Sequence, residues 1–403
     1  MGWLGLDDTD TLDEGCTTHA FDDLLRHLPS DVEVGTARLV RLWPFASGRT
    51  RGNAAVSVEL LTKNEAALME HLEDWWQTSL VHLKGQHSIS HHSSRQQQST
   101  DPGMVWFSHQ PDESAYWMTV RGEVKQRDLP IPDKEWGGLG CIGAIAAAAW
   151  PKHHSTWEGI AWRETSSPNT PRRVCEKTLK DIDEWPDTFL SRDPRRGVSL
   201  IAPRGPSPVL LGVRATSEST ASAALSSLLE SQDTEQASSF RIFQTNQASG
   251  DHLDGTRRVT IESVDVVRER KHATIQSSDG AMIAYAEGGP INRLARWLQP
   301  GDVVDVRGLH DPQGSLHIEQ MKLVSAKARQ RVRPSCKMCD VRMKSMGANQ
   351  GIRCPKCREQ HADAWIELEP EPPYLDWIEP PATHRRHLAR PLEWGVPETR
   401  FEP

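Results

Sequence analysis

The chain has 403 residues, enough for two to four domains at about 150 residues each. It carries 47 basic and 55 acidic side chains, and the net charge of −8 argues against a protein whose whole surface is basic for coating nucleic acid. No run of about 18 apolar residues is present, and an acidic cluster stands where a signal peptide needs basic and apolar residues. We therefore expect a cytosolic protein with no membrane partner.

The charge is distributed unevenly along the chain. Residues 1–150 hold 12 basic and 21 acidic groups, a net charge of −9. Residues 331–360 hold 8 basic and 2 acidic groups, a net charge of +6, and four of the seven cysteines lie in the same stretch. The net charge of the whole chain therefore hides segments of opposite charge. The basic stretch at 331–360 is a candidate for contact with nucleic acid.

Residues 1–134 are expected to form an α/β domain. Apolar residues at helical spacing, including Phe21, Leu24 and Leu28, predict a helix after the first strand. Residues 85–103 lack periodicity and are predicted to form a long loop. The other predicted elements are strands over 3–7, 38–44 and 54–61 and a helix over 64–76.

Residues 135–254 are expected to form a second domain. A glycine turn leads into an apolar helix at about 141–150, and two strand–helix–strand passes of suitable size fit a ferredoxin-like sandwich. The predicted strands cover 157–164, 197–202, 208–216 and 240–246, with a helix over 219–231.

Residues 255–328 show three predicted strands, one helix and two further strands, which is the order of an OB-fold barrel. A small barrel with a structural role is the alternative. A cysteine-containing module over 329–366 and a Pro/Trp-rich tail over 367–403 follow. Tryptophans of the tail, such as Trp394, either stack on bases or dock on other parts of the chain. The sequence thus predicts an α+β multidomain protein.

Two CxxC pairs, Cys336 with Cys339 and Cys354 with Cys357, are separated by fourteen residues. This spacing places four thiolates on two tight turns, which suits tetrahedral zinc. So short a module cannot bury enough apolar surface to fold alone, so metal binding supplies its folding free energy. Disulfides are disfavoured by a cytosolic location. We predict a structural zinc ribbon.

Basic side chains surround these cysteines and predict contacts with RNA phosphates. A solvated basic face without a ligand is the alternative. The residues are Arg331, Arg333, Lys337, Arg342, Lys344, Arg353, Lys356 and Arg358.

An acidic motif, Asp7-Asp8-Thr9-Asp10, follows the first strand and precedes Thr18. Three carboxylates within four residues repel one another, so their clustering predicts a cation, usually Mg²⁺ that carries phosphates. Hydroxyls and backbone N–H groups at the following helix start favour phosphate as well. Two alternatives stay open, a haloacid-dehalogenase-like signature, which position 12 breaks, and a simple acidic capping turn.

Two arginine-rich segments follow in the same acidic domain. They contain Arg38, Arg41, Arg49, Arg51 and Asn53. On a strand–loop–strand unit these side chains would offset nucleotide phosphates and stabilise transferring charge, although solvated arginines give the same pattern.

Glycines at Gly138, Gly140 and Gly143 match the G-x-G-x-x-G pattern of dinucleotide-binding folds. That fingerprint requires a preceding strand, and residues 127–136 do not predict one. Close packing of a helix on a sheet is the favoured interpretation of these glycines.

Several segments occur together in one order along the chain and cover roughly 1–390. The chain resembles the archaeal isoleucine-tRNA 2-agmatinylcytidine synthetases in MGWLGLDDTDTLDEGCTT, RTRGNAA, GGLGCIGAIAAAAW, NTPRRV, APRGPSPVLLGVR, FQTNQASGDHL and CKMC…CPKC.

The resemblance implies an ATP-dependent ligase that joins agmatine to C2 of the wobble cytidine in the minor isoleucine tRNA with a CAU anticodon, so that AUA is read as isoleucine. It implies a kinase-like N-terminal domain that cleaves ATP to AMP and phosphate. This domain phosphorylates a threonine of its own and activates the cytidine oxygen as a phosphate ester, which the amine displaces. A ferredoxin-like domain, an OB-fold and a zinc ribbon follow. ATP, Mg²⁺ and Zn²⁺ are the expected cofactors, and no protein partner is indicated.

The matching motifs also imply roles for individual residues. Thr18 matches the autophosphorylated threonine. Where the family generally has an acidic residue this chain has Ser207, so the agmatine site stays open, with Glu158 and Asp193 as candidates. The other carry-overs are Asp7, Asp8 and Asp10 for metal and phosphate, Arg49, Arg51 and Asn53 for phosphate, and Cys336, Cys339, Cys354 and Cys357 for zinc.

Two other functions are considered from the residues alone. One is a phosphotransferase or phosphatase that uses Asp8 on a small substrate. The other is a non-catalytic protein that binds tRNA or single strands through its C-terminal modules.

Overall fold

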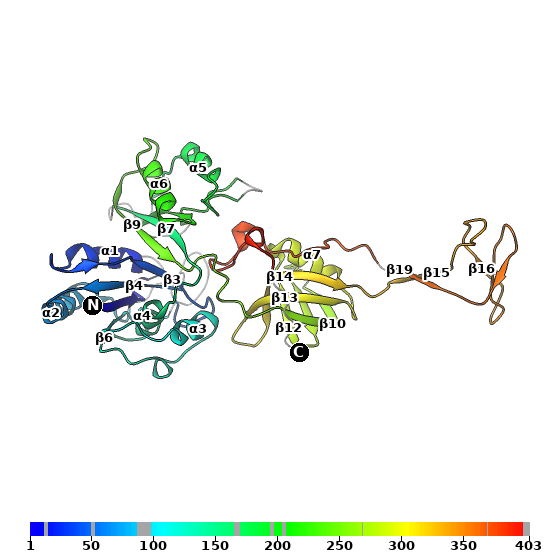
Figure 1. Cartoon of the computed structure of the whole chain (residues 1–403), viewed down its shortest axis with the longest axis horizontal. Coiled ribbons are helices and arrows are strands. Elements are labelled where there is room, and N and C mark those ends of the chain that lie inside the picture. The colour runs from blue at the N-terminus through cyan, green and yellow to red at the C-terminus, as the bar shows by residue number, and fades with distance from the viewer. Residues whose placement is uncertain are drawn as a thin grey trace. The chain divides into compact units, whose positions relative to one another are not determined.

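The computed structural model describes residues 1–11, 15–49, 53–86, 98–164, 170–193, 197–203, 207–267, 269–368 and 370–397. These residues form two compact units (Figure 1). The first holds Met1–Asp254 together with Ala382–Trp394, and the second holds Gly255–Pro381 and the chain from Gly395 onward. The expected mixture of helices and strands in several modules is confirmed.

The first unit is built on one nine-stranded sheet among the described residues. Its order is β6-β5-β1-β4-β3-β9-β7-β8, with β2 paired to β4. Strands β3 and β9 pair in parallel, which makes the sheet continuous across the boundary expected near residue 134. The strands are β1 (Gly2–Asp7), β2 (Glu33–Val34), β3 (Arg38–Arg41), β4 (Ala54–Leu61), β5 (Gly103–Phe107), β6 (Lys134–Gly137), β7 (Thr156–Arg163), β8 (Val209–Ala215) and β9 (Ala237–Thr245).

Two helical layers cover the β1 half of this sheet, one on each face. Successive side chains of β1 point to opposite faces and therefore enter different cores. Leu4 and Leu6 lie in the core that includes α1 (Thr17–His27) and α2 (Glu65–Ser79). Trp3 lies in the core that includes α3 (Ser114–Arg121) and α4 (Gly140–Ala149). Helix α4 packs so closely on β1 that a Cβ at Gly5 would lie 2.3 Å from the Ala144 oxygen. Apolar α4 therefore fixes the carboxyl end of β1.

Helices α5 (Glu176–Asp183) and α6 (Glu218–Leu229) contribute to a third core with β7 and β8. The strand expected over 197–202 is wrong. Gly197 has φ +63°, and Ser199 forms an isolated bridge with Arg192 instead of joining the main sheet. The chain enters the sheet later, at β8.

The second unit contains a closed five-stranded barrel in the order β10-β11-β12-β14-β13. Helix α7 (Pro290–Trp297) lies between the third and fourth strands in sequence, and its Ile291 and Leu294 enter the barrel core. The predicted sequence of three strands, one helix and two strands is confirmed. The strands are β10 (Arg257–Val266), β11 (Ala273–Ser277), β12 (Gly280–Ala284), β13 (Val303–His310) and β14 (Leu316–Ser325).

The cysteine module follows as a set of short strands. A two-stranded stem pairs β15 (Gln330–Val332) with β19 (Ile366–Leu368), and a three-stranded sheet joins β16 (Lys344–Ser345), β17 (Ile352–Arg353) and β18 (Gln360–His361). Single 3-10 turns lie at Val81–Leu83, Gln126–Asp128, Ala286–Gly288, Ala382–His384 and Leu392–Trp394. None of the helices in the described ranges has the length and apolar character needed to cross a bilayer.

Residues 382–394 belong to the first unit although they come last in sequence. Leu388 is buried in the core of α3 and α4, and the Trp394 ring lies 4.9 Å from the ring of Phe189. Of the two uses expected for the tail tryptophans, Trp394 therefore docks on another part of the chain. We call Ala382–Trp394 the return segment.

Candidate active site

The acidic motif begins where β1 ends. Asp7 is the last residue of the strand, and Asp8 takes a positive φ of 57°, which turns the chain sharply. The Asp8 N–H donates to Asp7 Oδ1 at 2.7 Å, and the Thr100 hydroxyl donates to the Asp10 carbonyl at 3.0 Å. The turn therefore holds three carboxylates together at the carboxyl end of β1, an interior strand of the sheet.

Asp101, which sequence reasoning missed, connects this turn to α4. Its N–H donates to Asp8 Oδ2 at 2.8 Å, and its own Oδ2 accepts from the Leu139 N–H at 2.8 Å. A Cβ at Gly143 would lie 1.9 Å from Asp7 Oδ2, so a larger residue there would push the Asp7 carboxylate out of its place. The start of α4 is thus part of the acidic site, and the expected packing role of the glycines holds as well.

One expectation about these glycines is wrong. Strand β6 (Lys134–Gly137) does precede them. It pairs with β5 and leads directly into α4. The strand is only four residues long and follows a proline-containing stretch, so no clear alternating pattern marks it in the sequence.

A first cavity of about 160 Å³ opens at this turn. Asn53 donates from its side chain to the Trp43 carbonyl at 2.6 Å, and Arg49 donates to the Ala46 carbonyl at 3.1 Å, which fixes one wall. Arg51 lies outside the described residues. Five residues that the sequence predicted for this site line the cavity, namely Asp7, Asp8, Asp10, Arg49 and Asn53. Leu139, Gly140 and Gly143 at the start of α4 line it as well.

The electrostatics of the acidic turn favour a cation. Burial, and then the neighbouring Asp8 carboxylate, raise the pKa of Asp7 well above its ordinary value. Burial raises the pKa of Asp8 to about 7. Carboxylates placed this way ionise fully only when positive charge is brought to them, and oxygen ligands of this kind suit Mg²⁺. Asp7 and Asp8 therefore fit the magnesium site expected from the sequence.

The raised pKa of Asp8 predicts that magnesium affinity depends on pH. Protons and Mg²⁺ compete for the same oxygens, so the apparent affinity should rise about tenfold per pH unit below pH 7 and level off above it. Asp7, whose pKa is also raised, steepens the rise. Calorimetric titration of the protein with Mg²⁺ at several pH values measures this. An affinity that does not change with pH, or that changes equally in Asp8→Asn, would contradict the assignment.

A second cavity of about 360 Å³ lies next to the first, and Asp10 lines both. Helix α1 begins here at Thr17, and both Thr17 and Thr18 line the cavity. Thr18 Oγ1 lies 3.0 Å from Cys16 Sγ, whereas Thr17 Oγ1 accepts from the Thr9 N–H at 3.4 Å. The acidic turn thus lies between two cavities, and the Thr18 hydroxyl belongs to the second.

Charged side chains from three strands meet in the second cavity. Glu158 of β7 is buried and accepts from Arg41 of β3 at 3.1 Å. Its other carboxylate oxygen lies 3.5 Å from Nε of Arg214 on β8. Glu158 is therefore in the cavity, as one of the two candidates for agmatine, but it is already paired with two arginines. The other candidate, Asp193, is buried and is not among the residues that line this cavity.

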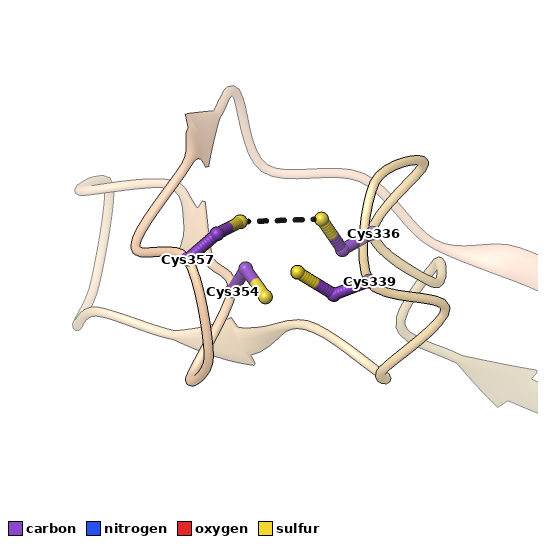
Figure 2. Close-up of side chains that lie close together, drawn as sticks. All are labelled: Cys336, Cys339, Cys354 and Cys357. Atoms are coloured by element: carbon purple, nitrogen blue, oxygen red, sulfur yellow. Dashed lines mark hydrogen bonds between the residues drawn. The ribbon is translucent and has the colours of Figure 1, made fainter.

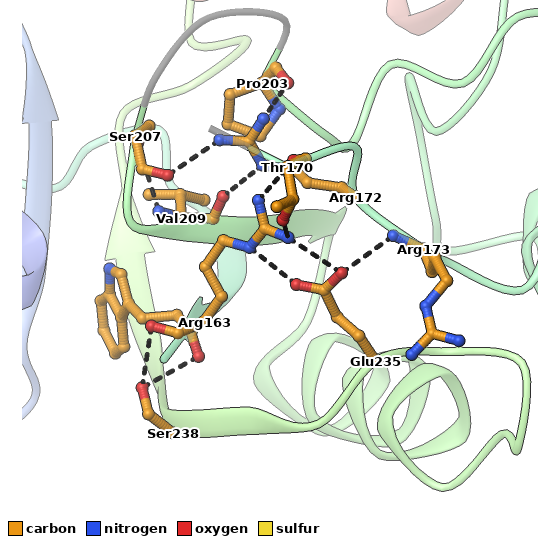
Figure 3. A network of polar contacts seen from close by, with 10 residues as sticks. Arg163, Thr170, Arg172, Arg173, Pro203, Ser207, Val209, Glu235 and Ser238 are labelled. Atoms are coloured by element: carbon orange, nitrogen blue, oxygen red, sulfur yellow. Dashed lines mark hydrogen bonds and ion pairs between the residues drawn. The ribbon is translucent and has the colours of Figure 1, made fainter. Parts of the chain in front are cut away.

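One wall of the second cavity is held in place by Arg172. Its guanidinium donates to the carbonyl oxygens of Pro203, Ser207 and Val209, each at 2.8 Å (Figure 3). All three of these residues line the cavity. Arg172 lies in the NTPRRV segment, so this motif shapes the cavity from outside it.

Arg38 does not join the other arginines. It is buried, donates to the Trp150 carbonyl at 3.3 Å and stacks at 4.0 Å on the Trp3 ring. Burial lowers its pKa to about 10. Arg38 lines neither cavity, because residues three apart in a strand point to opposite faces, and Arg41 points to the cavity side. The phosphate-binding role predicted for Arg38 is therefore not supported by its position.

The four cysteines of the second unit come together as predicted. Their sulfur atoms lie within 4.8 Å of one another and point inward from two turns (Figure 2). The cysteines are free thiols, which argues against the disulfide alternative. Backbone N–H groups, first that of Cys357, lower the pKa of the Cys354 thiol to about 7. Four converging thiols, one of them readily ionised, fit a tetrahedral zinc site.

The basic residues of the cysteine module fall into two groups. Arg333 stacks at 3.8 Å on Trp365 and pairs with Asp363, and Arg331 pairs with Glu367 at 3.4 Å, so both serve the two-stranded stem. The remaining predicted RNA contacts are exposed and form no ion pair among the described residues. They are Lys337, Arg342, Lys344, Arg353, Lys356 and Arg358.

Comparisons with known proteins agree with this arrangement. Models of the TiaS TCKD domain, the TiaS FLD domain and the TiaS C-terminal zinc ribbon domain match residues 3–70, 138–252 and 333–371. The isoleucine-tRNA 2-agmatinylcytidine synthetase TiaS of Methanopyrus kandleri is 30% identical, with 99% of each chain covered. That of Archaeoglobus fulgidus is 29% identical, with 97% of this chain and 96% of the relative covered.

A solved structure has a similar fold. The crystal structure of TiaS in complex with its isoleucine tRNA and ATP matches with a TM-score of 0.75 and 26% identity over 99% of both chains. The resemblance seen in the sequence is thereby confirmed, and the chain belongs to the family of isoleucine-tRNA 2-agmatinylcytidine synthetases, TiaS.

Proposed function

We propose that this protein uses ATP to join agmatine to C2 of the wobble cytidine in the isoleucine tRNA with a CAU anticodon. The relatives named for this activity match over nearly the full length of both chains, and a similar structure contains the isoleucine tRNA and ATP. This full-length match does not favour a small-molecule phosphotransferase or a non-catalytic RNA-binding protein.

The chemistry requires an activated cytidine. The C2 oxygen is a poor leaving group, whereas its phosphate ester can be displaced by an amine. Phosphoryl transfer depends mainly on positioning and on neutralising charge, which a carboxylate–Mg²⁺ site with arginines supplies. We assign the triphosphate of ATP to the first cavity, with Asp7 and Asp8 as magnesium ligands and Arg49 and Asn53 beside the phosphates.

We assign the cytidine and the amine to the second cavity. Thr18 is the proposed phosphate acceptor, and Arg41 and Arg214 there supply positive charge for a phosphate ester. The observation that carries this proposal is that Asp10 lines both cavities, so a phosphoryl group has a short path from the first cavity to the second.

The C-terminal modules are proposed to hold the tRNA. The strand order of the barrel is that of an OB-fold, which commonly binds oligonucleotides. The ribbon, with zinc on Cys336, Cys339, Cys354 and Cys357, presents its six exposed cations to phosphates. We propose functional domains at 1–134 (kinase-like), 135–254 (ferredoxin-like), 255–328 (OB-fold) and 329–366 (zinc ribbon), with a tail at 367–403.

Nucleoside analysis tests the function directly. Protein, ATP, Mg²⁺ and agmatine are incubated with a transcript of the isoleucine tRNA that has the CAU anticodon, and the digested nucleosides are analysed by mass spectrometry. Cytidine should gain the mass of agmatine less water, and only when ATP is present. A transcript with guanosine at the wobble position is the matched control and should stay unmodified. Absence of the product with the cognate transcript would contradict the proposal.

A further inference from the structure

The return segment is firmly attached to the first unit. The Ala248 N–H donates to the His387 carbonyl, and the Gly250 N–H donates to the Leu388 carbonyl, both at 2.8 Å. Leu388 is only 3% exposed and contacts the core of α3 and α4. Two backbone hydrogen bonds and a buried leucine fix the position of the adjoining side chain, which is that of His387.

His387 lines the second cavity together with Thr18. The positive charge of Arg41, then burial and the charge of Arg214, hold the pKa of His387 well below its ordinary value. The imidazole is therefore neutral at pH 7, and one of its ring nitrogens carries a free lone pair. The charged and titratable groups that line the cavity around it are Asp10, Cys16, Arg41, Glu158 and Arg214.

The proposed reaction needs a proton acceptor at this place. The agmatine nitrogen forms a bond to C2 of the cytidine, and the bond from C2 to the phosphorylated oxygen breaks, so phosphate leaves with the electron pair. The attacking nitrogen must lose a proton. The Glu158 oxygens are already occupied by Arg41 and Arg214, and Asp10 adjoins the magnesium ligands.

We propose, on the basis of the function proposed above, that His387 accepts this proton and that the return segment is therefore part of the active site. The segment lies far from the acidic motif in sequence, so no local pattern marks the histidine. Arg41 and Arg214 then have two functions, since they stabilise the phosphate ester and keep the imidazole neutral.

The test separates the two chemical steps in the full-length protein. His387→Ala should retain phosphoryl transfer from γ-labelled ATP, while agmatine incorporation falls by about 100-fold to 10,000-fold, the usual contribution of general acid–base catalysis. Added imidazole should restore part of the agmatine step. His384→Ala, in the same segment but outside both cavities, is the matched control and should behave as wild type.

Each outcome decides one question. Equal loss of both steps in His387→Ala and in the milder His387→Asn, or agmatine incorporation that stays at the wild-type rate, would overturn the role of His387. Loss of both steps in His387→Ala alone, with His387→Asn still phosphorylating but slow with agmatine, would support it. Absence of agmatine incorporation by the wild-type protein would instead contradict the proposed function itself.

Discussion

Replacing Thr18 with alanine is expected to abolish labelling of the protein by γ-labelled ATP and, with it, agmatine transfer. The Thr18 hydroxyl lines the second cavity, next to the acidic turn that is shared with the first. Thr17 lines the same cavity and is as buried as Thr18, but its hydroxyl is held by the N–H and hydroxyl of Thr9, each at 3.4 Å. Loss of this acceptor should reduce labelling of the protein to background.

Two controls make the result specific. Thr18→Ser keeps a hydroxyl at the same place and should retain labelling. Thermal unfolding of Thr18→Ala should resemble that of wild type, because the change removes one small hydroxyl and one methyl group. Undiminished labelling of Thr18→Ala would show that the acceptor is another residue, which peptide mass spectrometry would then identify.

Replacing Cys354 with serine is expected to release zinc and unfold the ribbon. The cluster of Cys336, Cys339, Cys354 and Cys357 has a very small apolar core of its own, to which Met343 adds. Structural zinc contributes about 10–16 kcal/mol of apparent binding free energy in small modules, far more than this core can supply. A colorimetric zinc assay on the purified variant measures the loss.

The same variant should bind tRNA more weakly and with less salt dependence. Each lost phosphate contact lowers the slope of log affinity against log salt by about 0.9 for duplex and about 0.7 for single strands. Labelling of Thr18 should persist, because it needs only the first unit. Cys175→Ser, a cysteine outside the ribbon, is the matched control. Unchanged affinity and salt slope in Cys354→Ser would show that the ribbon does not contact RNA.

The features that sequence reasoning found are those set by local patterns. In β13, Val304 and Val306 are two residues apart and both are buried, so the period of two identified the strand. The cysteine spacing fixed the two turns of the ribbon in the same way. The acidic motif could be recognised locally because adjacent carboxylates such as Asp7 and Asp8 repel each other, and a bound cation is what offsets that repulsion.

The features that it missed depend on contacts between distant segments. Nothing local shows that Leu39 will pair with Thr245 and so join two expected domains in one sheet. Arg214 and His387 reach the second cavity only through such long-range packing. The separation of Arg38 from Arg41 follows from their spacing alone, because residues three apart in a strand point to opposite faces.

The return segment has a consequence for the order in which the enzyme is made. The ribosome synthesises the barrel and the ribbon before Ala382–Trp394, so the first unit waits for its final segment until both modules have emerged. With the role proposed for His387, a prematurely terminated chain would lack the proton acceptor and would not complete the transfer. On these proposals, every chain able to finish the reaction would also carry the barrel and the ribbon, so the order of synthesis would keep a fragment from acting without the modules proposed to hold the RNA.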